Sequence, residues 1–156
     1  MEFLVSLGGW PGARWLQGSA TAYLLVNAAH ILGIGLILGA VLPLDARLLG
    51  LAPTVPMPML VPFLSRAASL GVALAVLTGL WLFTVRPAEY LANTAFLVKI
   101  GLLALALANV GWQHASGGYH RVLAGLQPTR AVRLRAFASM LLWLAILIAG
   151  RWIGFL

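Results

Sequence analysis

Four apolar stretches dominate this sequence, and each is about as long as the hydrocarbon core of a bilayer is thick. They cover residues 21–42, 60–85, 94–113 and 136–153. A helix needs roughly 20 mostly apolar residues to cross a membrane. Only 8% of the 156 residues are charged, whereas a soluble domain carries about 25%. The sequence therefore predicts an all-α integral membrane protein in which four transmembrane helices form one domain.

The connections between these stretches are short and contain proline, which favours breaks between helices over separate domains. Short connections make consecutive helices antiparallel neighbours, so we expect an up-down-up-down bundle. Residues 1–18 precede the first span. Their apolar run begins with Glu2 in place of basic residues and is interrupted by glycines, which is unlike a secretory signal. Trp10, Arg14 and Trp15 are typical of a segment that lies at the membrane interface.

Basic residues determine the predicted orientation. The net charge is +7, and six basic residues flank the loops after the first and third spans: Arg47, Arg66, Arg121, Arg130, Arg133 and Arg135. The other side carries Arg14, Arg86, Lys99 and Arg151. Because basic residues accumulate on the cytoplasmic side, both termini are expected on the outer side. In a chain this apolar such charges orient helices and do not indicate nucleic-acid binding. The absence of cysteine excludes thiolate metal sites and covalent haem attachment.

Polar side chains follow one side of the first and of the third predicted helix. At about 100° per residue, five positions of the first helix fall on one narrow stripe: Ser19, Tyr23, Asn27, His30 and Asp45. On the third helix a second stripe holds Lys99, Asn109, Gln113 and His120, while His114 lies apart. Polar residues inside a span usually face the bundle interior. We therefore expect the two stripes to face each other.

Packing between helices is one interpretation of this pattern. The amide side chains can form hydrogen bonds between neighbouring helices or line a binding site; they belong to Asn27, Asn109 and Gln113. The segment LGIGLILGA fits either close helix approach or space for a flat cofactor, because it contains three glycines: Gly33, Gly35 and Gly39.

The charged residues of the stripes also have two interpretations. Lys99 fits a side chain that extends to the outer interface. Asp45 and Arg47 fit a charge pair that fixes the cytoplasmic end of the first helix. Alternatively, Asp45 continues the stripe of His30 and gates or relays protons.

His30 is the leading candidate for a ligand-binding residue. It is expected near the middle of the membrane, where a neutral imidazole donates from one nitrogen and uses the other at a haem iron, a metal or a quinone. A histidine satisfied within the core is the alternative. His114 is the second candidate, whereas His120 is expected to be solvated. The register places His30 and His114 about 15 Å apart along the helix axis. Three interpretations of the site therefore remain: a haem bound by one histidine, a haem shared between protomers, or a quinone or metal site.

The first span, AHILGIGLILGAVLPLDARLLG, and the third, NTAFLVKIGLLALALANVGWQH, resemble a family of small four-helix bacterial membrane proteins defined only as a domain of unknown function. The resemblance covers most of the chain, and its carriers are His30, Asp45, Arg47, Asn93, Lys99, Asn109 and His114. More distantly, the layout is similar to copper-resistance D proteins and small b-type cytochromes. The resemblance implies a multi-pass protein of the bacterial inner membrane, and the distant likeness implies haem or copper chemistry.

These observations favour a redox module that binds haem b, a quinone or both, with copper as an alternative. The residues expected at the site are His30, His114, Asn27, Asn109, Tyr23 and Gln113, with the two histidines as metal ligands. A transporter of a metal or small solute, and an accessory subunit of a larger complex, are the alternatives. A second copy or a partner membrane subunit is expected. An enzyme acting alone is not, because the three acidic residues match no catalytic motif and no phosphate loop is present.

Overall fold

The computed structural model describes residues 2–51, 54 and 56–155, and within these ranges the chain forms helices and no strand. Four helices are long: α3 (Ala20–Leu49), α4 (Met57–Phe83), α6 (Thr94–Ala115) and α8 (Arg130–Trp152). The shorter ones are α1 (Glu2–Gly9), α2 (Pro11–Gly18), α5 (Pro87–Ala92), α7 (Gly117–Leu123) and a final 3-10 turn, η1 (Ile153–Phe155). The four long helices are long and apolar enough to cross a bilayer. The predicted all-α, multi-pass membrane protein is thus confirmed.

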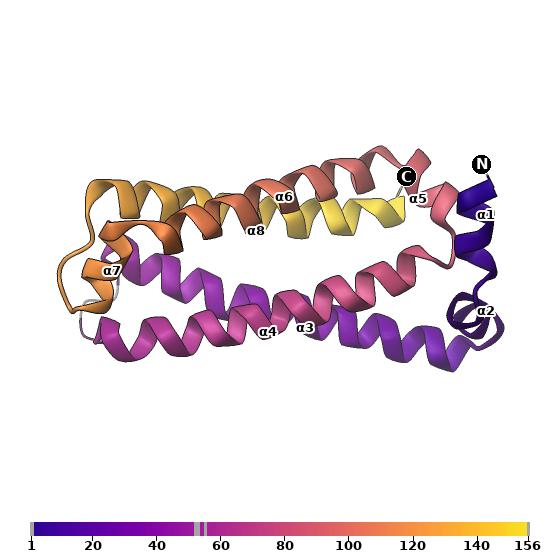
Figure 1. Cartoon of the computed structure of the whole chain (residues 1–156), viewed down its shortest axis with the longest axis horizontal. Helices are drawn as coiled ribbons and strands as arrows, with labels where there is room; N and C mark the ends of the chain where they lie inside the picture. The colour runs from indigo at the N-terminus through magenta and orange to yellow at the C-terminus, as the bar shows by residue number, and fades with distance from the viewer. Residues whose placement is uncertain (1, 52–53, 55, 156) are drawn as a thin grey trace.

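The long helices lie side by side in two pairs, α3 with α4 and α6 with α8 (Figure 1). The pairs are joined mainly where α3 packs against α8. The short helix α7 lies at one end of the bundle. At the other end lie α1, α2 and α5 together with both chain termini (Figure 1).

Local sequence signals explain where the long helices begin and end. Ser19 precedes α3, and its Oγ accepts a hydrogen bond from the Ala22 amide at 3.2 Å. Asn93 caps α6 in the same way, through a 3.2 Å bond from the Phe96 amide. Gly50 ends α3 with a φ of 98°, a left-handed conformation that glycine adopts without a steric cost.

Two of these helices continue well beyond the apolar stretches of the sequence. α3 runs on from residue 42 to Leu49, through Pro43. α8 begins at Arg130, six residues before the apolar stretch that starts at 136, because Thr129 caps it and arginine favours helix. The connections after the second and third spans also contain the short helices α5 and α7.

The closest helix contact is between α3 and α4, at small residues. A Cβ atom added to Gly33 would lie 2.8 Å from the backbone nitrogen of Ala75, and one added to Gly71 would lie 2.8 Å from the carbonyl oxygen of Gly33. Gly35 and Gly39 have no such neighbour within 4 Å. Of the two interpretations of this glycine segment, close helix approach therefore holds for Gly33.

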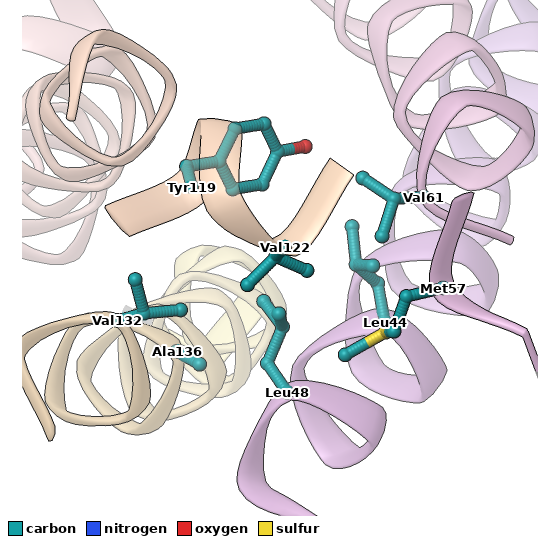
Figure 2. Close-up of a cluster of buried hydrophobic side chains, with 8 residues drawn as sticks. All are labelled: Leu44, Leu48, Met57, Val61, Tyr119, Val122, Val132 and Ala136. Atoms are coloured by element: carbon teal, nitrogen blue, oxygen red, sulfur yellow. The ribbon is translucent and has the colours of Figure 1, made fainter. Parts of the chain in front are cut away.

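Among the described residues, three clusters of buried apolar side chains lie along the length of the bundle. The cluster at the α7 end is drawn in Figure 2 and consists of Leu44, Leu48, Met57, Val61, Tyr119, Val122, Val132 and Ala136. A central cluster contains Ile37, Val41, Ala106, Trp143 and Ile146. The third cluster joins α2 to the beginning of α3 and the end of α4 through Leu16, Ala22, Val26 and Leu82.

Candidate functional site

His30 is held between α3 and α4 by a defined hydrogen bond. Its Nδ1 lies 3.0 Å from the hydroxyl oxygen of Thr78. The Thr78 hydroxyl lies 2.6 Å from the Leu74 carbonyl oxygen, which can only accept. The single hydrogen of Thr78 is therefore directed at Leu74, and the hydroxyl oxygen accepts from Nδ1–H of His30. A neutral imidazole in this arrangement carries its lone pair on Nε2.

A glycine makes room for this imidazole ring. A Cβ atom added to Gly79 would lie 3.0 Å from Cε1 of His30. A larger residue at position 79 would require the imidazole ring to shift by a few tenths of an ångström. The half-buried His30 ring is therefore positioned by Thr78 on one side and by the absence of a side chain at Gly79 on the other.

Lys99 reaches the same half of the bundle from α6. Its ammonium lies along Gly150 of α8, where an added Cβ would be 3.4 Å from Nζ. The positive charge of Lys99 acts on His30 across the interior. Among the described residues the ion pair is Arg86–Glu89, so Lys99 has no carboxylate partner there. Neither His30 nor Lys99 is therefore paired with a carboxylate among the described residues.

Tyr23 and Asn27 of the first stripe lie on the side of α3 toward the chain termini. Tyr23 is hydrogen-bonded to Tyr90 of α5. Burial, followed by the contact with Tyr23, raises the pKa of Tyr90 to about 12. Asn27 is half-buried one helical turn before His30. These two residues continue the polar side of α3 toward α5.

The polar residues of α6 face α8 and not α3. The side-chain amide of Asn109 donates to the Arg135 carbonyl at 3.0 Å, and that of Gln113 donates to the Val132 carbonyl at 3.1 Å. The expectation that the two stripes face each other is therefore wrong. α8 lies between α3 and α6 and receives the hydrogen bonds of the α6 stripe. The packing interpretation holds for these two amides.

His114 belongs to a second polar cluster, at the α7 end. Its Nδ1 donates to the Val110 carbonyl at 2.9 Å, which leaves Nε2 to accept from the Tyr119 hydroxyl at 3.3 Å. The Ser65 hydroxyl lies 3.2 Å from the Tyr119 oxygen and completes the chain. His120 is exposed and bonds the Ser116 carbonyl of its own turn. Its predicted exposure is confirmed.

Asp45 is not the interfacial partner of Arg47 that the sequence suggested. The Asp45 side chain is buried, with 5% exposed, and is hydrogen-bonded to Ser139 of α8. Both Asp45 and Arg47 are described by the structure, and no ion pair joins them. The reason is geometric, because residues two apart on a helix point in different directions. Asp45 therefore faces the core and Arg47 lies beside a cavity of about 340 Å³ at the α7 end.

The two candidate ligand histidines lie in different halves of the molecule. His30 contacts Thr78 and the His114 cluster contacts Ser65, and these two positions of α4 are thirteen residues apart. That separation corresponds to about 20 Å along the helix. One chain thus does not bring His30 and His114 to a common iron. The described residues also contain no group of three histidine, cysteine or acidic side chains that could hold a metal.

Several hydroxyl residues at these sites were not predicted from the sequence. Thr78 and Ser139 bond His30 and Asp45, and Ser65 bonds Tyr119. A hydroxyl in an apolar span is an ambiguous signal, because it can equally bond its own helix, as Ser69 bonds the Ser65 carbonyl. Only the partner helix distinguishes the two cases.

Comparisons of the chain with protein-family models, with curated proteins and with solved structures find no match. A functional conclusion therefore depends on the two polar clusters themselves.

Proposed function

We propose that this protein is a redox module of the bacterial inner membrane that binds a quinone or haem b at His30. In this proposal the bundle is up-down-up-down with both termini outside, as the short connections and the distribution of basic residues favour. The observation that carries the proposal is the Nδ1–H bond from His30 to Thr78. Histidines that bind metals usually donate their other ring N–H to a fixed acceptor, and this bond leaves Nε2 available.

The donor set at the site fits a quinone better than a haem. Nε2 of His30 can accept a hydrogen bond from a quinol hydroxyl, and the Lys99 ammonium can donate to a quinone oxygen. Lys99 adds positive charge, which favours an oxygen ligand over a cationic iron centre. A haem at this position would depend on His30 alone within one chain, because His114 lies about 20 Å away along the helix.

An apolar groove of about 390 Å³ lies at the same end of the bundle and suits the isoprenoid tail of a quinone. It runs between α6 and α8, and its lining includes Val98, Ile148 and Trp152. Val98 and Ala149 of the groove are adjacent in sequence to Lys99 and Gly150. A bound quinone exchanges electrons with a second centre, so we also propose that a partner membrane subunit or a second copy completes the pathway.

The test compares the wild type with His30→Ala and with His114→Ala as the matched control. Each protein is purified in mild detergent, its visible spectrum is recorded before and after dithionite, and its lipid extract is analysed for quinone. We expect a colourless protein that carries quinone, with the quinone lost in His30→Ala and kept in His114→Ala. A Soret band that is lost in His30→Ala would identify haem as the ligand instead. Neither ligand in the wild type, or equal amounts in both variants, would contradict the proposal.

A further inference from the structure

Asp45 presents a separate problem at the α7 half of the bundle. It is the only acidic residue of the four long helices, since Glu2 belongs to α1 and Glu89 to α5. Its carboxyl group is 5% exposed, and its neighbours Leu44 and Leu48 belong to the apolar cluster of Figure 2. An ionised carboxylate in such surroundings requires a positive partner.

No side chain of the described residues supplies that positive charge as an ion pair. Asp45 is hydrogen-bonded to the neutral Ser139 hydroxyl. Its Oδ2 atom is buried and has no hydrogen-bond partner. Arg135, four residues before Ser139, is directed toward α6, where its Nη1 donates to the Trp112 carbonyl at 3.4 Å. Within the part of the chain that the structure describes, the carboxylate therefore has no ion-pair partner and no donor for one of its oxygens.

A second oxygen without a partner lies on α6. Oε1 of Gln113 is buried and accepts no hydrogen bond, while the amide nitrogen of the same side chain bonds the Val132 carbonyl. Val132 and Ser139 are two turns apart on the same buried face of α8, with Ala136 between them. Among the described residues, one acceptor oxygen of α3 and one of α6 thus lack a hydrogen-bond partner, and their side chains contact α8 two turns apart. Acceptor oxygens without donors suit a cation.

A hydrogen-bonded chain of Ser65, Tyr119 and His114 lies at the same end of the bundle and reaches its surface. Tyr119 of α7 is 4% exposed, and the negative charge of Asp45 acts on its hydroxyl group. Burial raises the pKa of the Tyr119 hydroxyl, whereas the bond with Ser65 opposes that shift and the Asp45 charge adds to it. The hydroxyl therefore stays neutral and donates to Nε2 of the exposed His114. The Tyr119 hydroxyl can alternatively donate to the Ser65 oxygen, which lies 3.2 Å away.

We propose that Asp45 is a buried binding site for a monovalent cation, either a proton or an alkali ion, which it exchanges with the α7 end of the bundle. The carboxylate and the Ser139 hydroxyl hold the cation. Tyr119 and His114 are the titratable side chains that lie at the same end of the bundle, and Arg66 of α4 is exposed. This function is independent of the ligand at His30.

Labelling with dicyclohexylcarbodiimide tests the proposal in the full chain in membranes. The reagent partitions into apolar sites and reacts with a protonated carboxyl group. The carboxyl proton moves to a nitrogen of the reagent, a carboxyl oxygen bonds its central carbon, and an acyl shift leaves a stable N-acylurea. Peptide mass spectrometry locates the adduct. Glu89→Gln is the matched control, because Glu89 is exposed and paired with Arg86.

We expect labelling of Asp45 that is lost in Asp45→Asn and unchanged in Glu89→Gln. If sodium or lithium slows the labelling of Asp45 at constant pH, the bound cation is an alkali ion. If only a raised pH slows the labelling, the bound cation is a proton. Ser139→Ala should accelerate labelling, because the hydroxyl stabilises the ionised form. After a jump in pH or sodium concentration, Tyr119→Phe should delay the moment at which Asp45 becomes protected from labelling. An Asp45 that is never labelled, or whose labelling responds to neither pH nor alkali ions, overturns the proposal.

Discussion

Gly33 and Gly35 are two positions apart on α3, but a side chain at each position meets different surroundings. At Gly33 a Cβ would contact the backbone of α4 at 2.8 Å, and at Gly35 it meets no atom within 4 Å. Backbone cannot move aside as a flexible side chain does. We therefore expect Gly33→Leu to destabilise the bundle by about 1–3 kcal/mol or more, and Gly35→Leu to have little effect. Thermal unfolding in detergent would show this difference, and equal midpoints for the two variants would contradict the packing argument.

The hydroxyl of Thr78 provides a second prediction, which depends on the proposed ligand site. Thr78→Val keeps the shape of the side chain but removes the acceptor for Nδ1–H of His30. Because the hydrogen bond fixes the imidazole, its loss should lower the affinity of the ligand for the His30 site by about 10–100-fold. Ser69→Ala is the control, since Ser69 bonds only the Ser65 carbonyl of its own helix. Ligand titration of purified protein measures the effect, and equal affinities in both variants would argue against a role for Thr78.

The sequence identified His30 and Asp45 as the unusual residues, because an imidazole or a carboxylate in an apolar helix is costly wherever it points. It could not supply their partners. Thr78 and Ser139 look like any other small polar residue of a span, and their significance depends on which helix faces them. Arg47 shows the reverse error, since proximity in sequence suggested an ion pair that the helix geometry does not allow.

Among the elements, α2 is attached to α4 by tryptophans. The indole nitrogen of Trp81 donates to the Gly12 carbonyl at 3.1 Å, and its ring stacks on Trp15 with centroids 5.7 Å apart. Trp81→Phe retains an aromatic ring but loses the hydrogen bond, which contributes about 1 kcal/mol. We expect faster hydrogen exchange in α2 and unchanged exchange in α6. Trp152→Phe, on the exposed face of α8, is the comparison variant; the same acceleration of α2 in both variants would contradict the docking role of Trp81.

The four long helices could be predicted because each contains an apolar stretch that only a membrane helix can satisfy. The short helices α5 and α7 could not, since a helix of six or seven residues depends on packing and caps more than on composition. The extension of α8 to Arg130 has the same origin. Hydropathy marks where lipid begins, whereas the helix begins where Thr129 caps it.

For the whole molecule, the pairing of helices was the main feature that periodicity left open. A helical wheel shows which side of a helix is polar, but it does not show which neighbour that side meets. Two stripes on alternate spans suggested direct contact, yet α8 lies between α3 and α6 and accepts the bonds of Asn109 and Gln113. The molecule consequently has two separate polar regions, at His30 and at Asp45, in place of one shared site.

The proposed orientation of the whole bundle can be tested through the absence of cysteine. Single cysteines at Ala88 in α5 and at Gln127 between α7 and α8 would mark opposite ends, and both positions are exposed. With the arginine-rich end in the cytoplasm, a membrane-impermeant maleimide should label Ala88→Cys in intact spheroplasts and Gln127→Cys only after permeabilisation. The reverse pattern would place the termini in the cytoplasm. The Asp45 site would then exchange its cation with the outside and the His30 site would lie toward the cytoplasm, so this measurement also decides from which side each ligand enters.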